Sequence, residues 1–143
     1  MKLSRRDVLA AGAGGLAMAM AAPWAAEAAS AAAFDDALNK FTGGAKMAEG
    51  GVTLNAPEIA ENGNTVPISI DAPGATEVMI MAPKNPTPVI CTFKFGPLAA
   101  SRKAATRVRL AGTQEVSAIA KMADGSFKMV KVAVKVTVGG CGG

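Results

Sequence analysis

From residue 52 onward, hydrophobic and polar positions alternate along most of the chain, a pattern typical of β-strands with one buried face. Residues that favour turns, such as Asn, Asp, Pro and Gly, separate the alternating runs. The strongest turn signal is Asp124-Gly125, a dipeptide that favours a tight hairpin. The pattern predicts about seven short strands, over residues 52–54, 65–70, 77–82, 89–95, 106–110, 115–122 and 127–138.

Three of these strands depart from simple alternation. Pro67 cannot donate a backbone hydrogen bond, so we expect it at a sheet edge or a bulge. The alternation of the last strand breaks near Val130 and Lys131, which predicts a bulge there. Residues 79–81, Met-Ile-Met, predict a strand that is buried on both faces or that faces a second subunit.

One helix is predicted ahead of the strands, over Ala31–Phe41. Phe34, Leu38 and Phe41 lie on one face of it, and Thr42-Gly43-Gly44 ends it. We expect this helix to cover one edge or end of a sheet. The predicted fold class is therefore all-β, an immunoglobulin-like antiparallel β-sandwich with a short N-terminal helix.

The start of the chain has the features of an export signal. Arg5 and Arg6 form a twin-arginine pair, and a weakly apolar stretch rich in Ala and Gly follows over residues 8–22. That stretch is too short and too poor in large apolar side chains to span a membrane. The alternatives are an ordinary Sec signal and an alanine-rich leader.

Small residues at positions 25–29 supply a cleavage site, so the mature chain is expected to start between Glu27 and Ala31. The expected organisation is a signal peptide over 1–29, a β-sandwich domain over 30–138 and a C-terminal arm over 139–143. Export by the twin-arginine route predicts a periplasmic protein that has no membrane segment after cleavage.

Composition excludes several functional classes. The 143 residues include no His and only two Cys, which rules out a His-based triad and a structural zinc site. The net charge is +4, and the basic residues form no cluster with interleaved aromatic residues, which argues against nucleic-acid binding. We therefore predict no catalytic residues, no metal and no cofactor.

The candidate chemistry lies at the C-terminus, where Gly139, Gly140, Cys141, Gly142 and Gly143 directly follow the last predicted strand. The flanking glycines leave the thiol without neighbouring side chains and give the backbone wide freedom. Two glycines extend the thiol roughly 7 to 10 Å beyond the strand. The pattern predicts a slim, flexible arm that presents Cys141 to a partner's active site.

No histidine or helix N-terminus is near Cys141 in the sequence to favour its thiolate, and the terminal carboxylate opposes a second negative charge. Activation by a partner is therefore expected, as in a carrier protein. The alternative is a frayed tail whose Cys141 forms an adventitious intermolecular disulfide.

The second cysteine, Cys91, is predicted to be a buried thiol that acts as a small hydrophobe on the same face as Val89 and Phe93. A disulfide between Cys91 and Cys141 is the alternative, and it would prevent the arm from moving.

The terminal Gly-Gly-Cys-Gly-Gly after a long strand, on a precursor with a twin-arginine signal, resembles the SoxY family. SoxY proteins are the sulfur-carrying subunits of the bacterial thiosulfate-oxidising (Sox) system. The resemblance extends over nearly the whole chain, and Cys91 is a departure from the family's pattern. It rests on residues 5–6, 57–63, 65–68, 106–110, 113–114, 121–127 and 139–143.

The resemblance implies a non-catalytic carrier with an immunoglobulin-like fold that forms a heterodimer with a SoxZ-like subunit. It implies that the haem enzyme SoxAX joins thiosulfate to Cys141 and that the metal-dependent hydrolase SoxB then removes sulfate. A sulfane dehydrogenase would oxidise the remaining sulfur.

Two other functions remain as alternatives. Gly142-Gly143 is also the ending of ubiquitin-like sulfur carriers, which use a C-terminal thiocarboxylate. That chemistry needs ATP-dependent adenylation, which export disfavours, and no mid-chain helix is predicted. The other alternative is a secreted structural subunit linked by an intermolecular Cys141 disulfide.

Overall fold

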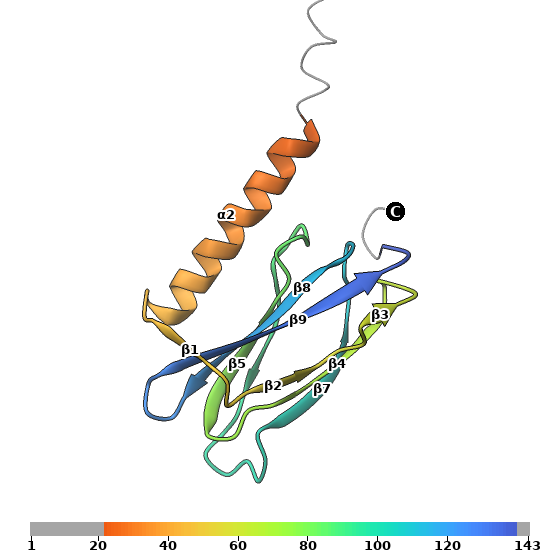
Figure 1. Cartoon of the computed structure of the whole chain (residues 1–143). Coiled ribbons are helices and arrows are strands. Elements are labelled where there is room, and N and C mark those ends of the chain that lie inside the picture. The colour runs from red at the N-terminus through yellow and green to blue at the C-terminus, as the bar shows by residue number, and fades with distance from the viewer. Residues whose placement is uncertain (1–21, 140–143) are drawn as a thin grey trace, which may run out of the picture.

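The computed structural model describes residues 22–139, in which one helix, α2 (Ala22–Thr42), precedes nine strands (Figure 1). The larger sheet has the order β1-β9-β8-β5-β6, with β3 also paired to β9, and the smaller sheet has the order β2-β4-β7. The strands are β1 (Met47–Glu49), β2 (Thr53–Asn55), β3 (Ile59–Ala60), β4 (Val66–Asp71), β5 (Ala75–Met81), β6 (Val89–Lys94), β7 (Lys103–Val108), β8 (Gln114–Met122) and β9 (Phe127–Val136).

The main hydrophobic core is formed by the facing sides of the two sheets. Alternating residues of β4, β5, β8 and β9 point into it, as expected for strands with one face on a sandwich core. This arrangement confirms the predicted immunoglobulin-like β-sandwich. Fully buried members of the core include Val66, Val78, Ile80, Leu110, Val116 and Val134.

Helix α2 covers a face of the larger sheet, so the expectation that it covers an edge or end was wrong (Figure 1). Its predicted apolar face, which includes Phe34 and Leu38, packs against side chains of β5, β8 and β9. The rings of Phe41 and Phe127 meet edge to face, with centroids 5.8 Å apart. The helix ends at Thr42 as predicted. It begins well before Ala31, consistent with the high helix propensity of the alanine-rich segment.

The run at residues 79–81 of β5 is buried on both faces, which was one of the two predicted alternatives. Ile80 lies in the core between the sheets, whereas Met79 and Met81 lie under α2. Helix α2 therefore buries the side of β5 that, in the other alternative, a second subunit would cover.

The bulge predicted in β9 was wrong, because β8 and β9 pair in one continuous register. Phe127 and Met129 pack under α2. Val130, Val132 and Val134 pack between the two sheets. The helix covers only the first part of β9, so the buried face changes along a regular strand. In the sequence, this change resembles a bulge.

Two short strands were not predicted. β1 pairs in parallel with β9 over Phe127–Met129, and β3 pairs in parallel with β9 over Lys135–Val136. Their residues, Met-Ala-Glu and Ile-Ala, show no repeating alternation of hydrophobic and polar positions, so only their tertiary pairing reveals them.

Pro67 lies on the middle strand of the smaller sheet, but beyond the end of β2, so one side of β4 is an edge at this position. It pairs with Arg107 of β7, while β2 contacts only Ser69–Asp71 on the other side of β4. The missing backbone N–H of Pro67 therefore interrupts no ladder to β2.

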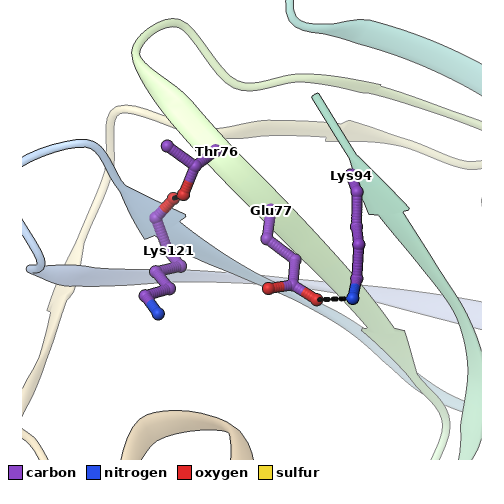
Figure 2. A network of polar contacts seen from close by, with 4 residues as sticks. All are labelled: Thr76, Glu77, Lys94 and Lys121. Atoms are coloured by element: carbon purple, nitrogen blue, oxygen red, sulfur yellow. Dashed lines mark hydrogen bonds and ion pairs between the residues drawn. The ribbon is translucent and has the colours of Figure 1, made fainter. Parts of the chain in front are cut away.

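Polar side chains connect β5 to both of its neighbours near its first residues (Figure 2). The Thr76 hydroxyl donates to the Lys121 carbonyl at 3.2 Å, and the Glu77 carboxylate pairs with the Lys94 ammonium at 3.7 Å. An exposed ion pair contributes at most about 1 kcal/mol. These contacts therefore favour the register of the three strands more than they stabilise the fold.

The hairpin between β8 and β9 turns at Asp124-Gly125, as predicted. Gly125 has φ +84°, a left-handed conformation that side chains disfavour. The Asp124 carboxylate accepts hydrogen bonds from the Ser126 hydroxyl at 2.6 Å and the Ser126 N–H at 2.8 Å. These two bonds lower the pKa of Asp124.

Gly125→Ala is expected to lower the free energy of unfolding by about 1 kcal/mol, because the left-handed backbone opposes a Cβ. Nothing lies within 4 Å of the added methyl group, so backbone strain is the expected cause. Gly96→Ala is a matched control, since its site is equally open and has no positive φ. Denaturant unfolding should show a change below about 0.5 kcal/mol for the control. Equal losses in both variants would contradict the prediction.

Candidate functional site

The structure describes the place where the predicted arm leaves the sandwich. Gly139 is the last described residue. Cys141, Gly140, Gly142 and Gly143 lie outside the described residues, as do Arg5 and Arg6 of the predicted signal. Their predicted roles stay predictions. What can be built from the structure is the arm root, defined here as residues 137–139.

Backbone hydrogen bonds hold the first two residues of the arm root. The Thr137 N–H donates to the Ala60 carbonyl at 3.0 Å, and the Val138 carbonyl accepts from the Gly63 N–H at 2.7 Å. The Thr137 hydroxyl also donates to the Glu61 carbonyl at 2.8 Å. The last residue of β3 and the segment that follows it therefore fix the chain just beyond the end of β9.

Gly139 lies against the backbone of Ala111. A Cβ added at Gly139 would collide with the Ala111 carbonyl oxygen, and the residue is half-buried. From the sequence, Gly139 was expected to give the backbone of the arm conformational freedom. The structure adds a packing reason, because only glycine allows the two backbones to approach this closely.

A buried pair of side-chain amides, Asn85 and Gln114, holds the loop that contains Ala111. The Asn85 Oδ1 accepts from the Ala111 N–H at 2.9 Å and from the Gln114 Nε2 at 3.0 Å. The Asn85 Nδ2 donates to the Arg109 carbonyl at 2.8 Å. From the sequence alone, Asn85 was given no role and Gln114 was used only as part of the family resemblance. The sequence does offer one signal: each amide lies near the end of a predicted strand, Asn85 after residues 77–82 and Gln114 before residues 115–122.

Cys91 lies on β6, an edge strand of the larger sheet, opposite Ile80. It is half-buried and packs with Phe93 against the core between the sheets. Val89 instead packs in the cluster under α2, because the register shifts between Ile80 and Met81. The prediction that Cys91 shares a face with Phe93 is therefore confirmed, and the prediction for Val89 was wrong. The predicted burial of the thiol is only partial, because β6 is an edge strand.

Partial burial raises the pKa of the Cys91 thiol above its ordinary value, so this cysteine is a poor nucleophile at neutral pH. The alternative of a Cys91–Cys141 disulfide is not tested, because Cys141 lies outside the described residues.

Cys91 is expected to react with iodoacetamide at neutral pH about threefold or more slowly in the folded chain than in the urea-unfolded chain. Its raised pKa and partial burial both reduce the accessible thiolate. Mass spectrometry of the Cys141→Ser variant would measure this rate, since Cys91 is then the remaining thiol. Equal rates in the folded and unfolded chains would contradict the prediction.

Within residues 22–139, no three His, Cys, Asp or Glu side chains gather in a way that could hold a metal ion. The same part of the chain contains no helix with the length and apolar character needed to cross a membrane.

The family model described as "Sulfur oxidation protein SoxY" matches residues 38–141. The match runs from the second half of α2, through every strand, to Cys141. The chain belongs to the SoxY family. This result confirms the resemblance that the sequence motifs indicated. Comparison with curated proteins found no match.

Solved structures agree with the family assignment. The sulfur carrier protein SoxY from Chlorobium limicola f thiosulfatophilum is similar, with a TM-score of 0.65 and 32% identity, over 76% of this chain and 99% of that chain. The superoxide reductase (neelaredoxin) from Ignicoccus hospitalis has a TM-score of 0.51 at 13% identity, over 61% of this chain and 80% of that chain. A single-residue variant of the same reductase gives 0.53 at 14%, over 59% and 78%. The likeness to the reductases concerns the fold alone.

The family and the SoxY structure together identify the chain as a sulfur carrier of sulfur oxidation. Family membership places it among proteins of the Sox system.

Proposed function

We propose that this SoxY-family protein is an exported, non-catalytic carrier that holds sulfur covalently on Cys141. The observation that carries the proposal is the position of Gly139. The chain is fixed at the arm root beyond the end of β9, and the family match extends from there to Cys141. A thiol two residues past a fixed point can be offered to a separate enzyme.

Loading requires a two-electron oxidation. The Cys141 sulfur forms a bond to the outer sulfur of thiosulfate, the thiol proton leaves, and two electrons pass to an oxidant. A haem enzyme of the SoxAX type is the proposed acceptor of these electrons. The product is cysteine S-thiosulfonate, a reversible cap on the thiol.

Unloading begins with hydrolysis. Water attacks the terminal sulfonate sulfur, the sulfur–sulfur bond breaks, and sulfate leaves while a persulfide remains on Cys141. A metal-dependent hydrolase of the SoxB type is the proposed catalyst. A sulfane dehydrogenase is then proposed to oxidise the outer persulfide sulfur to a sulfonate, with three water molecules supplying the oxygen atoms and six electrons passing to the dehydrogenase. The carrier itself supplies the thiol and the arm, in a heterodimer with a SoxZ-like subunit.

The proposed location is the periplasm, reached by the twin-arginine route through Arg5 and Arg6. Intact mass spectrometry of the exported protein should give a mature N-terminus between Glu27 and Ala31. Replacement of both arginines by lysine should leave the precursor unprocessed, and normal processing of that variant would overturn the proposed route.

The same mass spectra test the carrier function. Protein from cells that oxidise thiosulfate should show additions of ~32 Da and ~112 Da, both lost on reduction. Peptide mapping should place both on the Cys141 side chain. Sulfur in place of a terminal oxygen at Gly143 would instead support a thiocarboxylate carrier, and the absence of any sulfur adduct would overturn the proposal.

A further inference from the structure

The buried amides of Asn85 and Gln114 direct their hydrogen bonds to loop backbone and to each other. Besides the contacts with Ala111 and Arg109, the Gln114 Nε2 donates to the Gly112 carbonyl at 3.3 Å. The Gln114 Oε1 accepts from the Lys84 N–H at 2.8 Å. Asn85 and Gln114 are only 6% and 5% exposed as whole residues. Buried amides are costly unless they are hydrogen-bonded, and here the compensating bonds fix the shape of residues 109–112.

This loop is also tied to the segment that holds the arm root. The Leu110 N–H donates to the Gly63 carbonyl at 2.8 Å, and the Gly63 N–H donates to the Val138 carbonyl at 2.7 Å. Gly63 therefore bridges the loop and the chain that leads to the arm. Gly139 lies directly on the Ala111 carbonyl at the end of this chain of contacts.

We propose that Asn85 and Gln114 are positioning residues for the carrier arm. They hold the Ala111 carbonyl as a support on which Gly139 rests, so that the arm pivots after Gly139 and not at the end of β9. The proposal rests on the carrier function proposed above, because only a mobile Cys141 needs a defined pivot.

A defined pivot limits the space in which the thiol moves. From Gly139, two residues carry Cys141 roughly 7 Å at full extension. A pivot at Val136 would add three residues and enlarge the volume that the thiol samples. A larger volume lowers the effective concentration of the thiol at the active site of a docked enzyme. Fixing the arm root therefore favours transfer.

A nitroxide spin label on Cys141 tests the proposal, in the full mature chain with Cys91→Ala so that one thiol is labelled. Gly139→Ala displaces the arm root from Ala111 without removing a hydrogen bond. Asn85→Ala removes the amide that holds Ala111. Both should shorten the rotational correlation time of the label by about twofold or more. A merely structural Asn85 would lower the unfolding temperature without changing the motion of the label.

Two control variants should leave the label motion unchanged. Gly140→Ala adds the same methyl group one residue later and controls for lost glycine freedom. Thr76→Val removes the hydrogen bond from the Thr76 hydroxyl to the Lys121 carbonyl (Figure 2). Lys121 lies near the last residue of β8, whereas Gln114 is its first residue. An increase of label motion in either control would overturn the assignment of the pivot.

Unchanged label motion in Gly139→Ala overturns the proposal by itself, whether or not Asn85→Ala folds. Unchanged motion in a folded Asn85→Ala variant overturns the role of the amide pair. The label reports motion and not sulfur. Failure of the carrier function would appear separately, as missing sulfur adducts in the mass spectrum.

Discussion

Cys141→Ser should abolish the sulfur adducts of the protein while leaving its stability unchanged. A serine hydroxyl cannot form the sulfur–sulfur bond that loading requires. Within the described residues, the hydrophobic core is built from residues 52–134 together with the cluster under α2. Because serine is close to cysteine in size and shape, we expect no change in stability. Intact mass spectrometry of protein from thiosulfate-oxidising cells would show the loss of the adducts. Denaturant unfolding would show an unchanged midpoint.

Cys91→Ala is the matched control, since it removes the other thiol of the chain. It should keep the adducts at the level of the parent protein. Adducts that persist in Cys141→Ser and vanish in Cys91→Ala would show that sulfur is carried on β6. If Cys141→Ser abolished a disulfide-linked dimer and left thiosulfate oxidation intact, the chain would be a structural subunit.

Ile80→Ala is expected to lower the free energy of unfolding by about 2 to 5 kcal/mol, the range for truncation of a large buried aliphatic side chain. Ile80 is fully buried between the sheets, on a strand that is paired on both sides. Its truncation leaves a cavity that the neighbouring strands cannot easily fill. Since small domains are stable by roughly 5 to 15 kcal/mol, the loss is a large share of the total.

Leu98→Ala controls for the removal of an aliphatic side chain at the surface, because Leu98 is 96% exposed. Denaturant unfolding should show a change within about 0.5 kcal/mol for this variant. A loss below about 1 kcal/mol for Ile80→Ala would mean that the core relaxes around the cavity.

Much of the fold could be predicted because its signals are local. The alternation of Val66, Ile68 and Ile70 and the Asp124-Gly125 turn each depend on neighbours in sequence, and the structure confirms both. The errors concern contacts between distant segments. The face covered by α2, the unbroken register of β9 and the existence of β1 and β3 are decided by tertiary packing.

The candidate site could likewise be predicted only where its signals are local in the sequence. Cys141 stands out in the sequence because glycines isolate it at the end of a long strand. The contact between Gly139 and Ala111 joins positions far apart in the chain, so sequence spacing could not reveal it. Asn85 and Gln114 resemble ordinary loop amides until their hydrogen bonds to residues 109–112 are seen.

The short parallel strands β1 and β3 have a consequence for solubility. They pair with the two ends of β9, over Phe127–Met129 and Lys135–Val136. An exposed sheet edge is a template for pairing with other chains and for aggregation. The two short strands therefore cover both ends of this edge of β9 and leave only residues 130–134 of it without a strand partner. A free edge of five residues is a shorter template for edge-to-edge self-association than the whole strand would be.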